Sequence, residues 1–204
     1  MRTAFIGMGG NLASSAGLPE VTLAAAALRL ESLGRVVCRS SLYSTAPVGF
    51  ASQPRFVNAV VAMETALTPR ELLDELLAIE QQFGRDRVAN IANGPRTLDL
   101  DILFFGDLEI SDPGLTIPHP RLAERAFVLV PLNEIAPQAL DPVSGKTVSQ
   151  LLQSLRETGQ GETDAALPIQ SDSWRAGACR GDVYPVADLH TEPCDIENLG
   201  HGRG

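Results

Sequence analysis

The spacing of apolar residues changes along the first 156 residues between the period of a β-strand and that of an α-helix. Strand-like runs occupy residues 3–9, 35–43, 55–65 and 98–105. Helix-like runs occupy residues 19–33, 69–83, 127–136 and 148–156. These runs are long enough together to predict one domain with a packed core.

A glycine-rich segment, Gly7-Met8-Gly9-Gly10-Asn11, ends the first predicted strand. We interpret it as a strand-to-helix turn that needs glycine because its backbone adopts positive φ. The segment also resembles the start of a dinucleotide-binding fingerprint. Leu12 stands where the third glycine of that motif belongs, so we reject this interpretation.

Two long segments lack a regular period. Residues 44–54 contain two prolines and a glycine, and residues 84–95 carry Arg85 and Arg87. Long loops inside a compact domain often bear function. We therefore predict that both segments are loops that flank the functional site.

The predicted strand at residues 98–105 places two aspartates in an apolar run, directly after Gly94-Pro95-Arg96. Because side chains alternate on a strand, Asp99 and Asp101 point to the same side, about 6–7 Å apart along the chain. Two carboxylates that lose hydration beside apolar surface repel each other, so a cation must lie close to them. The candidates are a bound Mg²⁺ and the guanidinium of Arg96.

Five further side chains are candidates for binding. Phe56 and Asn58 share one face of a predicted strand, which suits a flat polar heterocycle; the alternative is a core ring beside a strand-edge amide. Glu80 lies in the last turn of a helix, where the dipole disfavours a carboxylate, so we predict a specific partner for it. His119 and Arg125 lie around a short helical turn and either contact phosphate or are structural.

The charge of the chain restricts the class of ligand. The net charge of −9 divides into −4 for residues 1–155 and −5 for residues 156–204. An acidic chain is not typical of a general nucleic-acid binder. A cluster of arginines in the middle of the chain nevertheless favours a small anionic ligand. The cluster comprises Arg85, Arg87, Arg96, Arg121 and Arg125.

Composition also predicts where the protein acts. No run of about 18 apolar residues is present, so no membrane span is expected. The first residues lack the apolar core and cleavage site of a signal peptide. The three cysteines form neither a CxxC pair nor an even disulfide framework. We expect a cytoplasmic monomer that binds small molecules and has no nucleic-acid or membrane partner.

The composition changes after about residue 157, where glycine, proline and acidic residues replace the periodic apolar residues. Such a segment buries too little apolar surface to fold on its own. We therefore divide the chain into a domain at residues 1–156 and an acidic, disordered or loosely packed tail at residues 157–204.

Taken in order, the motifs of residues 1–155 resemble the 6-hydroxymethyl-7,8-dihydropterin pyrophosphokinase family. The most specific motif is the run Gly94-Pro95-Arg96-Thr97-Leu98-Asp99-Leu100-Asp101. The other matching pieces are Gly10-Asn11-Leu12, residues 43–49, residues 53–59, Glu80 with Arg85 and Arg87, Pro118-His119, and Arg125 with Phe127. Asn93 departs from the family, which often has an aromatic residue there.

The resemblance implies a ferredoxin-like α+β fold, in which helices pack on one face of an antiparallel sheet, followed here by an irregular C-terminal tail. It implies an enzyme of folate biosynthesis that transfers pyrophosphate from ATP to the hydroxymethyl group of a reduced pterin and releases AMP. Two Mg²⁺ ions are the implied cofactors, and ATP is the co-substrate.

The resemblance also assigns roles to residues of this sequence. It makes Asp99 and Asp101 the metal ligands, and the implied catalytic group is Arg85, Arg96, Asp99 and Asp101. The implied pterin-binding residues are Thr45, Val48, Phe56, Asn58 and Phe127. The implied ATP-binding residues are Glu80, Arg85, Arg87, Arg96, His119 and Arg125.

Two alternatives stay open at this point. One is a non-catalytic ferredoxin-like ligand-binding module, which would show no Mg²⁺-dependent nucleotide binding. The other is a different Asp-x-Asp Mg²⁺-dependent transferase, such as a nucleotidyl- or glycosyltransferase. This second alternative explains the two aspartates but does not explain Phe56, Asn58 and Phe127 together.

Overall fold

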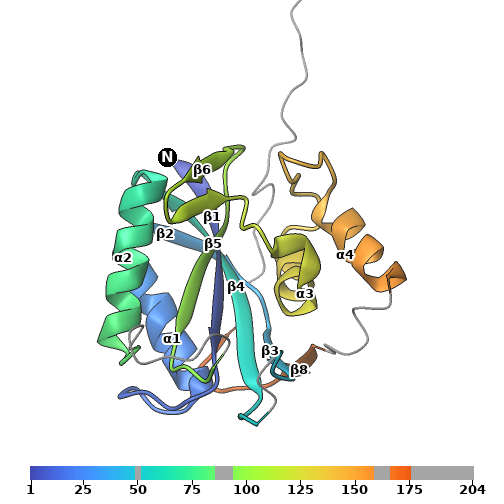
Figure 1. Ribbon diagram of the computed structural model, residues 1–204. Helices are drawn as coiled ribbons and strands as arrows, with labels where there is room; N and C mark the ends of the chain where they lie inside the picture. Colours follow the sequence, from blue (N-terminus) through green and yellow to red (C-terminus); the bar gives the residue numbers. More distant parts are fainter. Residues whose placement is uncertain (49–51, 86–93, 159–165, 176–204) are drawn as a thin grey trace, which may run out of the picture.

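A computed structural model describes residues 1–48, 52–85, 94–158 and 166–175 (Figure 1). The elements are β1 (Arg2–Gly10), α1 (Pro19–Leu30), β2 (Arg35–Arg39), β3 (Leu42–Thr45), β4 (Phe56–Thr65), α2 (Pro69–Gln82), β5 (Asp99–Phe105), β6 (Ile110–Asp112), β7 (Leu115–Ile117), a 3-10 turn (Leu122–Glu124), α3 (Ala126–Ile135), α4 (Val148–Glu157) and β8 (Leu167–Ile169). All the predicted strands and helices are present, although the strand predicted at residues 35–43 is divided into β2 and β3. In the described ranges, no helix is both long and apolar enough to cross a membrane.

The main sheet is antiparallel, and its strands lie in the order β5–β1–β4–β3–β8. β2 and β3 pair with opposite ends of β4, which is ten residues long (Figure 1). β6 and β7 form a separate two-stranded ribbon. The expectation of an α+β fold built on an antiparallel sheet is therefore confirmed.

Helices cover both faces of this sheet, so the expectation of helices on one face alone is wrong (Figure 1). α1 and α2 cover one face, and α3 and α4 cover the other. The reason lies in the strands, because β1 buries Ile6 and Met8 in the core cluster that contains α1 and α2, and Phe5 in the cluster that contains α3 and α4. A sheet that is apolar on both faces needs a helical layer on each.

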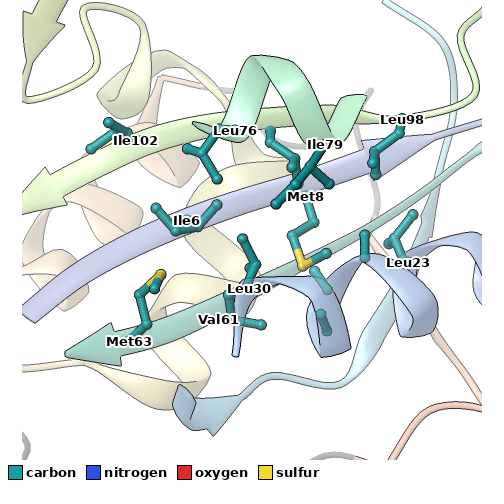
Figure 2. Packing of buried hydrophobic residues seen from close by; sticks show 14 of the residues in the cluster. Ile6, Met8, Leu23, Leu30, Val61, Met63, Leu76, Ile79, Leu98 and Ile102 are labelled. Atoms are coloured by element: carbon teal, nitrogen blue, oxygen red, sulfur yellow. The ribbon is translucent and has the colours of Figure 1, made fainter. Parts of the chain in front are cut away.

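The larger core cluster lies between the sheet and the first two helices. α2 is fixed at its start by a capping box, in which the backbone nitrogen of Thr68 donates to the Glu71 carboxylate at 2.8 Å and Thr68 Oγ1 accepts from the Glu71 nitrogen at 3.3 Å. The cluster includes Ile6, Met8, Leu23, Leu30, Val61, Met63, Leu76, Ile79, Leu98 and Ile102 (Figure 2). This packing holds β1 and β5 rigidly at the point where the candidate site is built.

The glycines at positions 7, 9 and 10 lie within β1, so the predicted strand-to-helix turn is wrong. They are needed for close approach to neighbouring segments. A Cβ on Gly10 would lie 2.4 Å from the backbone oxygen of Thr97, and a Cβ on Gly9 would lie 2.8 Å from Oδ1 of Asn58. Glycine is present here because the surroundings leave no room for a side chain.

Part of the segment after α4 packs against the domain. β8 pairs with β3, and Trp174 is only 6% exposed in the larger core cluster. This strand was not predicted, because Leu167-Pro168-Ile169 is too short to show a period and contains a proline. The boundary near residue 156 coincides with the last turn of α4, and the division into domain and tail stays a prediction.

We expect Gly10→Ala to lower the free energy of unfolding by about 2–3 kcal/mol, because the new methyl group would press on the backbone of Thr97. Gly7→Ala is the matched control. Its Cβ would meet the movable Leu103 side chain at 3.2 Å, so the expected loss is below about 1 kcal/mol. Urea unfolding followed by circular dichroism measures both values, and equal losses would contradict the close-approach explanation.

Candidate active site

Two adjoining cavities form the candidate active site. The first is lined by Thr45, Ala46, Val48, Phe56, Asn58, Arg96, Arg121, Glu124, Arg125 and Phe127. The second is lined by Asp99 and Asp101 of β5, together with side chains and backbone of β1, β4 and α3. The cavities are neighbours because they share lining residues, which are Asn58, Arg96, Arg125 and Phe127.

The first cavity combines aromatic rings with amide and hydroxyl groups. All five residues expected to bind pterin line it. The pairing of β3 with β4 sets Thr45 opposite Phe56, and Asn58 follows two residues later on β4. Asn58 is 6% exposed and donates from Nδ2 to Oγ1 of Thr45 at 2.7 Å. Both polar groups are thus held in fixed orientation beside the Phe56 ring, as recognition of a flat polar ligand requires.

An arginine guanidinium lies over each of the two rings that line the first cavity. Cζ of Arg96 is 4.7 Å from the centroid of Phe56, and Cζ of Arg125 is 5.5 Å from the centroid of Phe127. Both distances lie within the range of a cation–π contact. The two arginines also line the second cavity, so positive charge is shared between the aromatic and the acidic parts of the site.

The carboxylate of Asp99 has an arginine at each oxygen. Nε of Arg96 lies 2.9 Å from Oδ2, and Nη1 of Arg85 donates to Oδ1. Arg85 also donates to the backbone oxygen of Leu98 at 2.8 Å. The prediction of a guanidinium beside the aspartates is confirmed for Arg96, and Arg85 joins it there.

The ionised form of Asp101 is disfavoured by its surroundings. Burial, and after it the charge of Asp99, raise the pKa of Asp101 from 3.8 to about 7, although Arg125 and Arg85 act in the opposite direction. The nearby arginines therefore do not fully offset the burial of Asp101 and the charge of Asp99. A cation bound beside Asp101 would favour its ionised form.

Glu80 has the specific partners that its position in the helix predicted. Its carboxylate is 1% exposed, and Oε1 accepts from the backbone nitrogen of Leu100 at 2.8 Å. Oε2 lies 3.5 Å from Nε of Arg85. Glu80 lines neither cavity. Its contacts hold β5 and Arg85 in place from the interior of the protein.

His119 is held as a neutral imidazole. Its Nδ1 accepts a hydrogen bond from the backbone nitrogen of Arg121 at 3.1 Å, so Nε2 carries the proton. Burial, and after it the charge of Arg125, lower the pKa of His119 to about 4. His119 lines neither cavity. Burial also lowers the pKa of Arg125, and Arg121 adds to that effect.

Asn11 is a structural residue of the site to which the sequence alone assigned no role. It is 4% exposed, and its Oδ1 accepts from the backbone nitrogen of Arg96 at 2.8 Å. Its Nδ2 donates to Oε1 of Gln53 and to the backbone oxygen of Pro54, both at 3.0 Å. Asn11 thereby ties the end of β1 to Arg96 and to the segment before β4. A buried amide directly after a glycine-rich strand is the signal that identifies it.

Four further residues complete the account of the predicted site. Val48 lines the first cavity and is 44% exposed. Arg87 lies outside the described residues. Arg121, a member of the predicted arginine cluster, and Glu124, to which no role was assigned, also line the first cavity and form an ion pair with 3.3 Å between Nε and Oε2.

Comparison with known proteins identifies sequence relatives. A family model described as 7,8-dihydro-6-hydroxymethylpterin-pyrophosphokinase (HPPK) matches residues 5–137. A 2-amino-4-hydroxy-6-hydroxymethyldihydropteridine pyrophosphokinase of Synechocystis is 46% identical over 152 residues, which cover 74% of this chain and 75% of the relative. The protein of the same name from Methylorubrum extorquens is 42% identical over 161 residues, which cover 78% and 97%.

Solved structures show the same fold at low identity. A crystal structure of Plasmodium falciparum HPPK-DHPS has a TM-score of 0.61 and is 16% identical. The match covers 79% of this chain but 44% of that longer chain. The likeness supports the antiparallel α+β architecture.

We expect Asp101→Asn to stabilise the protein in nucleotide-free buffer with a chelator, by roughly 1–4 kcal/mol at pH 8. The pKa of Asp101 is higher in the folded state than in the unfolded state, so the wild type loses stability as the pH rises from about 4 to about 7. The advantage of the variant should therefore grow over this range and be smallest near pH 4. Urea unfolding at several pH values measures it.

Asp112→Asn is the control for this experiment, because Asp112 is an exposed aspartate on β6. Its effect on stability should be small at every pH. A constant difference between wild type and Asp101→Asn across the pH range would contradict the raised pKa.

Proposed function

The chain belongs to the 7,8-dihydro-6-hydroxymethylpterin-pyrophosphokinase family, and we propose that its two adjoining cavities are the site of the reaction. The enzyme transfers pyrophosphate from ATP to the hydroxymethyl group of 6-hydroxymethyl-7,8-dihydropterin in folate synthesis, and AMP is released. The observation that carries the proposal is that the two cavities share lining residues. Arg96 and Arg125 line both the cavity that contains the aromatic rings and Asn58 and the cavity that contains Asp99 and Asp101.

We propose that the pterin ring binds in the first cavity. A pterin is flat and presents donors and acceptors along its edge, so it can stack on Phe56 and Phe127 and hydrogen-bond with Asn58. Asn58 already donates to Oγ1 of Thr45, which leaves the hydroxyl hydrogen of Thr45 for an acceptor of the ligand. Val48 contributes an apolar edge to the same cavity.

The phosphates of ATP belong, in this proposal, near the arginines between the two cavities. The nucleophile is a primary hydroxyl, and its target is a phosphorus surrounded by negative oxygens, so positioning and charge neutralisation supply most of the catalysis. Arg96 and Arg125 line both cavities and carry that charge, and Arg85, which lines neither cavity, adds to it through its ion pair with Asp99. Arg87 is proposed to act with them, although it lies outside the described residues.

His119 and Glu80 have more specific roles in the proposal. His119 is neutral at pH 7, so it contacts ATP as an N–H donor through Nε2 and adds no positive charge. The carboxylate of Glu80 faces Leu100 and Arg85 inside the protein. Glu80 therefore supports ATP binding by holding Arg85, and a direct contact with the nucleotide stays a prediction from the family resemblance.

We propose Asp99 and Asp101 as ligands of two Mg²⁺ ions. The donor set fits, because both carboxylates line one cavity and the raised pKa of Asp101 marks a deficit of positive charge. No group of three acidic, histidine or cysteine side chains that could hold a metal exists among the residues described. Mg²⁺ is commonly held by one or two carboxylates together with substrate phosphates and water, so this site should need ATP for tight binding. When bound, Mg²⁺ neutralises phosphate charge and polarises the hydroxyl group.

The two alternatives are less well supported. A non-catalytic module does not require arginines paired with a carboxylate pair beside an aromatic cavity. A different Asp-x-Asp transferase does not explain why Thr45, Phe56, Asn58 and Phe127 line one cavity. Both also disagree with the family to which the chain belongs.

The direct test is AMP release from ATP with 6-hydroxymethyl-7,8-dihydropterin and Mg²⁺. We expect Asp99→Ala to lower kcat by about 10²–10³-fold, because it removes a proposed Mg²⁺ ligand and the carboxylate that pairs with Arg85 and Arg96 beside the reacting phosphates. Asp107→Ala is the matched control, since the side chain of Asp107 is 92% exposed and pairs only at the surface with Arg2, and full activity is expected. Absence of pterin-dependent AMP release by the wild type would refute the proposed function.

A second test addresses the pterin cavity. Phe56→Ala should raise the KM for pterin about tenfold, because stacking is lost, while the KM for ATP changes less than about twofold. Steady-state kinetics with each substrate varied in turn separates the two. A larger effect on the KM for ATP than on that for pterin would place the pterin elsewhere.

Two properties remain predictions from the sequence. We propose that the enzyme acts in the cytoplasm as a monomer and has small-molecule partners only. Light scattering on the purified protein measures the oligomeric state.

A further inference from the structure

The segment at residues 166–175 lies beyond the residues matched by the family model, which end at 137. It nevertheless completes the sheet beside the first cavity (Figure 1). β8 pairs antiparallel with β3, and the pairs are Leu42 with Ile169, Tyr43 with Pro168, and Ser44 with Leu167. β8 thus covers an edge of β3 that β4 does not reach.

Trp174 fixes this segment to the start of β3. The indole is 6% exposed, and its Nε1 donates to the backbone oxygen of Ser40 at 2.8 Å. Ser40 is itself fully buried, and its backbone nitrogen donates to the oxygen of Val60 on β4 at 2.9 Å. The guanidinium of Arg39 lies 5.8 Å from the centre of the indole. The indole therefore contacts the last residue of β2 and the residue that follows it, just before β3 begins.

β3 ends in the wall of the proposed pterin cavity. Thr45 is its last residue, accepts from Asn58, and is followed by Ala46, which also lines the cavity. A four-residue strand has few hydrogen bonds of its own, so its position depends on what pairs with both of its edges.

A second restraint acts on β3 from the opposite layer. Glu134 of α3 accepts from the backbone nitrogen of Ser41 at 2.9 Å, from its hydroxyl at 2.8 Å, and from the hydroxyl of Tyr43 at 2.9 Å. Burial, and then this carboxylate, raise the pKa of Tyr43 to about 12, so the tyrosine remains a donor. Glu134 thus holds Ser41 and Tyr43 from the side of α3, whereas β8 pairs with Leu42 to Ser44 and so reaches the residue before Thr45.

We propose that residues 166–175 position the pterin site: β8 and Trp174 hold β3, and β3 holds Thr45 and the adjoining Ala46 in the cavity wall. Trp174 is a positioning residue, because it lines neither cavity and acts through Ser40 and β3. The inference rests on the proposed assignment of the first cavity to pterin. It predicts that the C-terminal segment affects one substrate and not the other.

Pro168 also affects the outer edge of β8. It stands in the middle of the outermost strand and has no backbone N–H to offer a further strand. Among the described residues β8 is the last strand of the sheet, and its pairing with β3 covers the edge of β3 beside the proposed pterin site.

The test uses the full chain with Trp174→Phe and Trp174→Ala. Trp174→Phe keeps an aromatic ring but removes the hydrogen bond to Ser40, and we expect the KM for pterin to rise about threefold to tenfold. Trp174→Ala should raise it further. kcat and the KM for ATP should change less than about twofold, because the arginines and aspartates keep their contacts.

Loss of stability alone must be separated from loss of positioning. Leu155→Ala is the matched control, since Leu155 is a buried residue of α4 in the other core cluster. It should lower the melting temperature but leave the KM for pterin unchanged. The assays are made at a temperature at which circular dichroism shows that every variant is folded. If Trp174→Ala does not fold, Trp174→Phe alone is compared with the wild type.

Hydrogen exchange tests the positioning step without substrate. Amides of residues 42–45 should exchange faster in Trp174→Phe than in the wild type, whereas amides at residues 99–105 should not change. An unchanged KM for pterin in the Trp174 variants, an equal rise for both substrates, or unchanged exchange in β3 would overturn the inference. Failure of the wild type to release AMP would instead refute the proposed function and leave the exchange result to decide on β3.

Discussion

Two carboxylates on the same side of a buried strand impose the main constraint on this structure. Asp99 and Asp101 line one cavity, and their mutual repulsion adds to the effect of burial on Asp101. Arginines from three separate segments partly neutralise that negative charge. Arg85 follows α2, Arg96 precedes β5, and Arg125 precedes α3. Each arginine has to be brought to the cavity and kept there, and much of the surrounding fold serves that purpose.

Two of these arginines, Arg85 and Arg96, are held by buried polar residues. Glu80 faces Arg85 from the interior, and Asn11 accepts from the backbone nitrogen of Arg96. These contacts bridge segments far apart in sequence, and a buried polar group is stable only when its partners are in place. The close approach at Gly10, where a Cβ would meet Thr97, allows the Asn11 contact to form.

Regular elements were predicted well because apolar spacing is a local property, and their capping and packing agree with it. The predictions that failed concern features that depend on contacts between residues far apart in the sequence. The glycines at positions 7–10 suggested a turn, yet their reason is the proximity of Thr97 and Asn58, which no local pattern encodes. The second helical layer was missed because the resemblance implied helices on one face only. β8 was missed because a three-residue strand with a proline forms only against an existing edge.

The sequence predicted which residues form the candidate site, but it did not predict the contacts between them. The sequence identified the aromatic and amide residues of the first cavity and the aspartates of the second. It did not indicate that Arg96 contacts both the Phe56 ring and the Asp99 carboxylate. A side chain that is shared in this way links the two cavities physically: a ligand that draws the Arg96 guanidinium toward phosphate removes charge from the face of Phe56 and from Asp99 together. Arg96 is therefore the physical link between the two cavities, since its one guanidinium contacts the aromatic wall of the first and a carboxylate of the second.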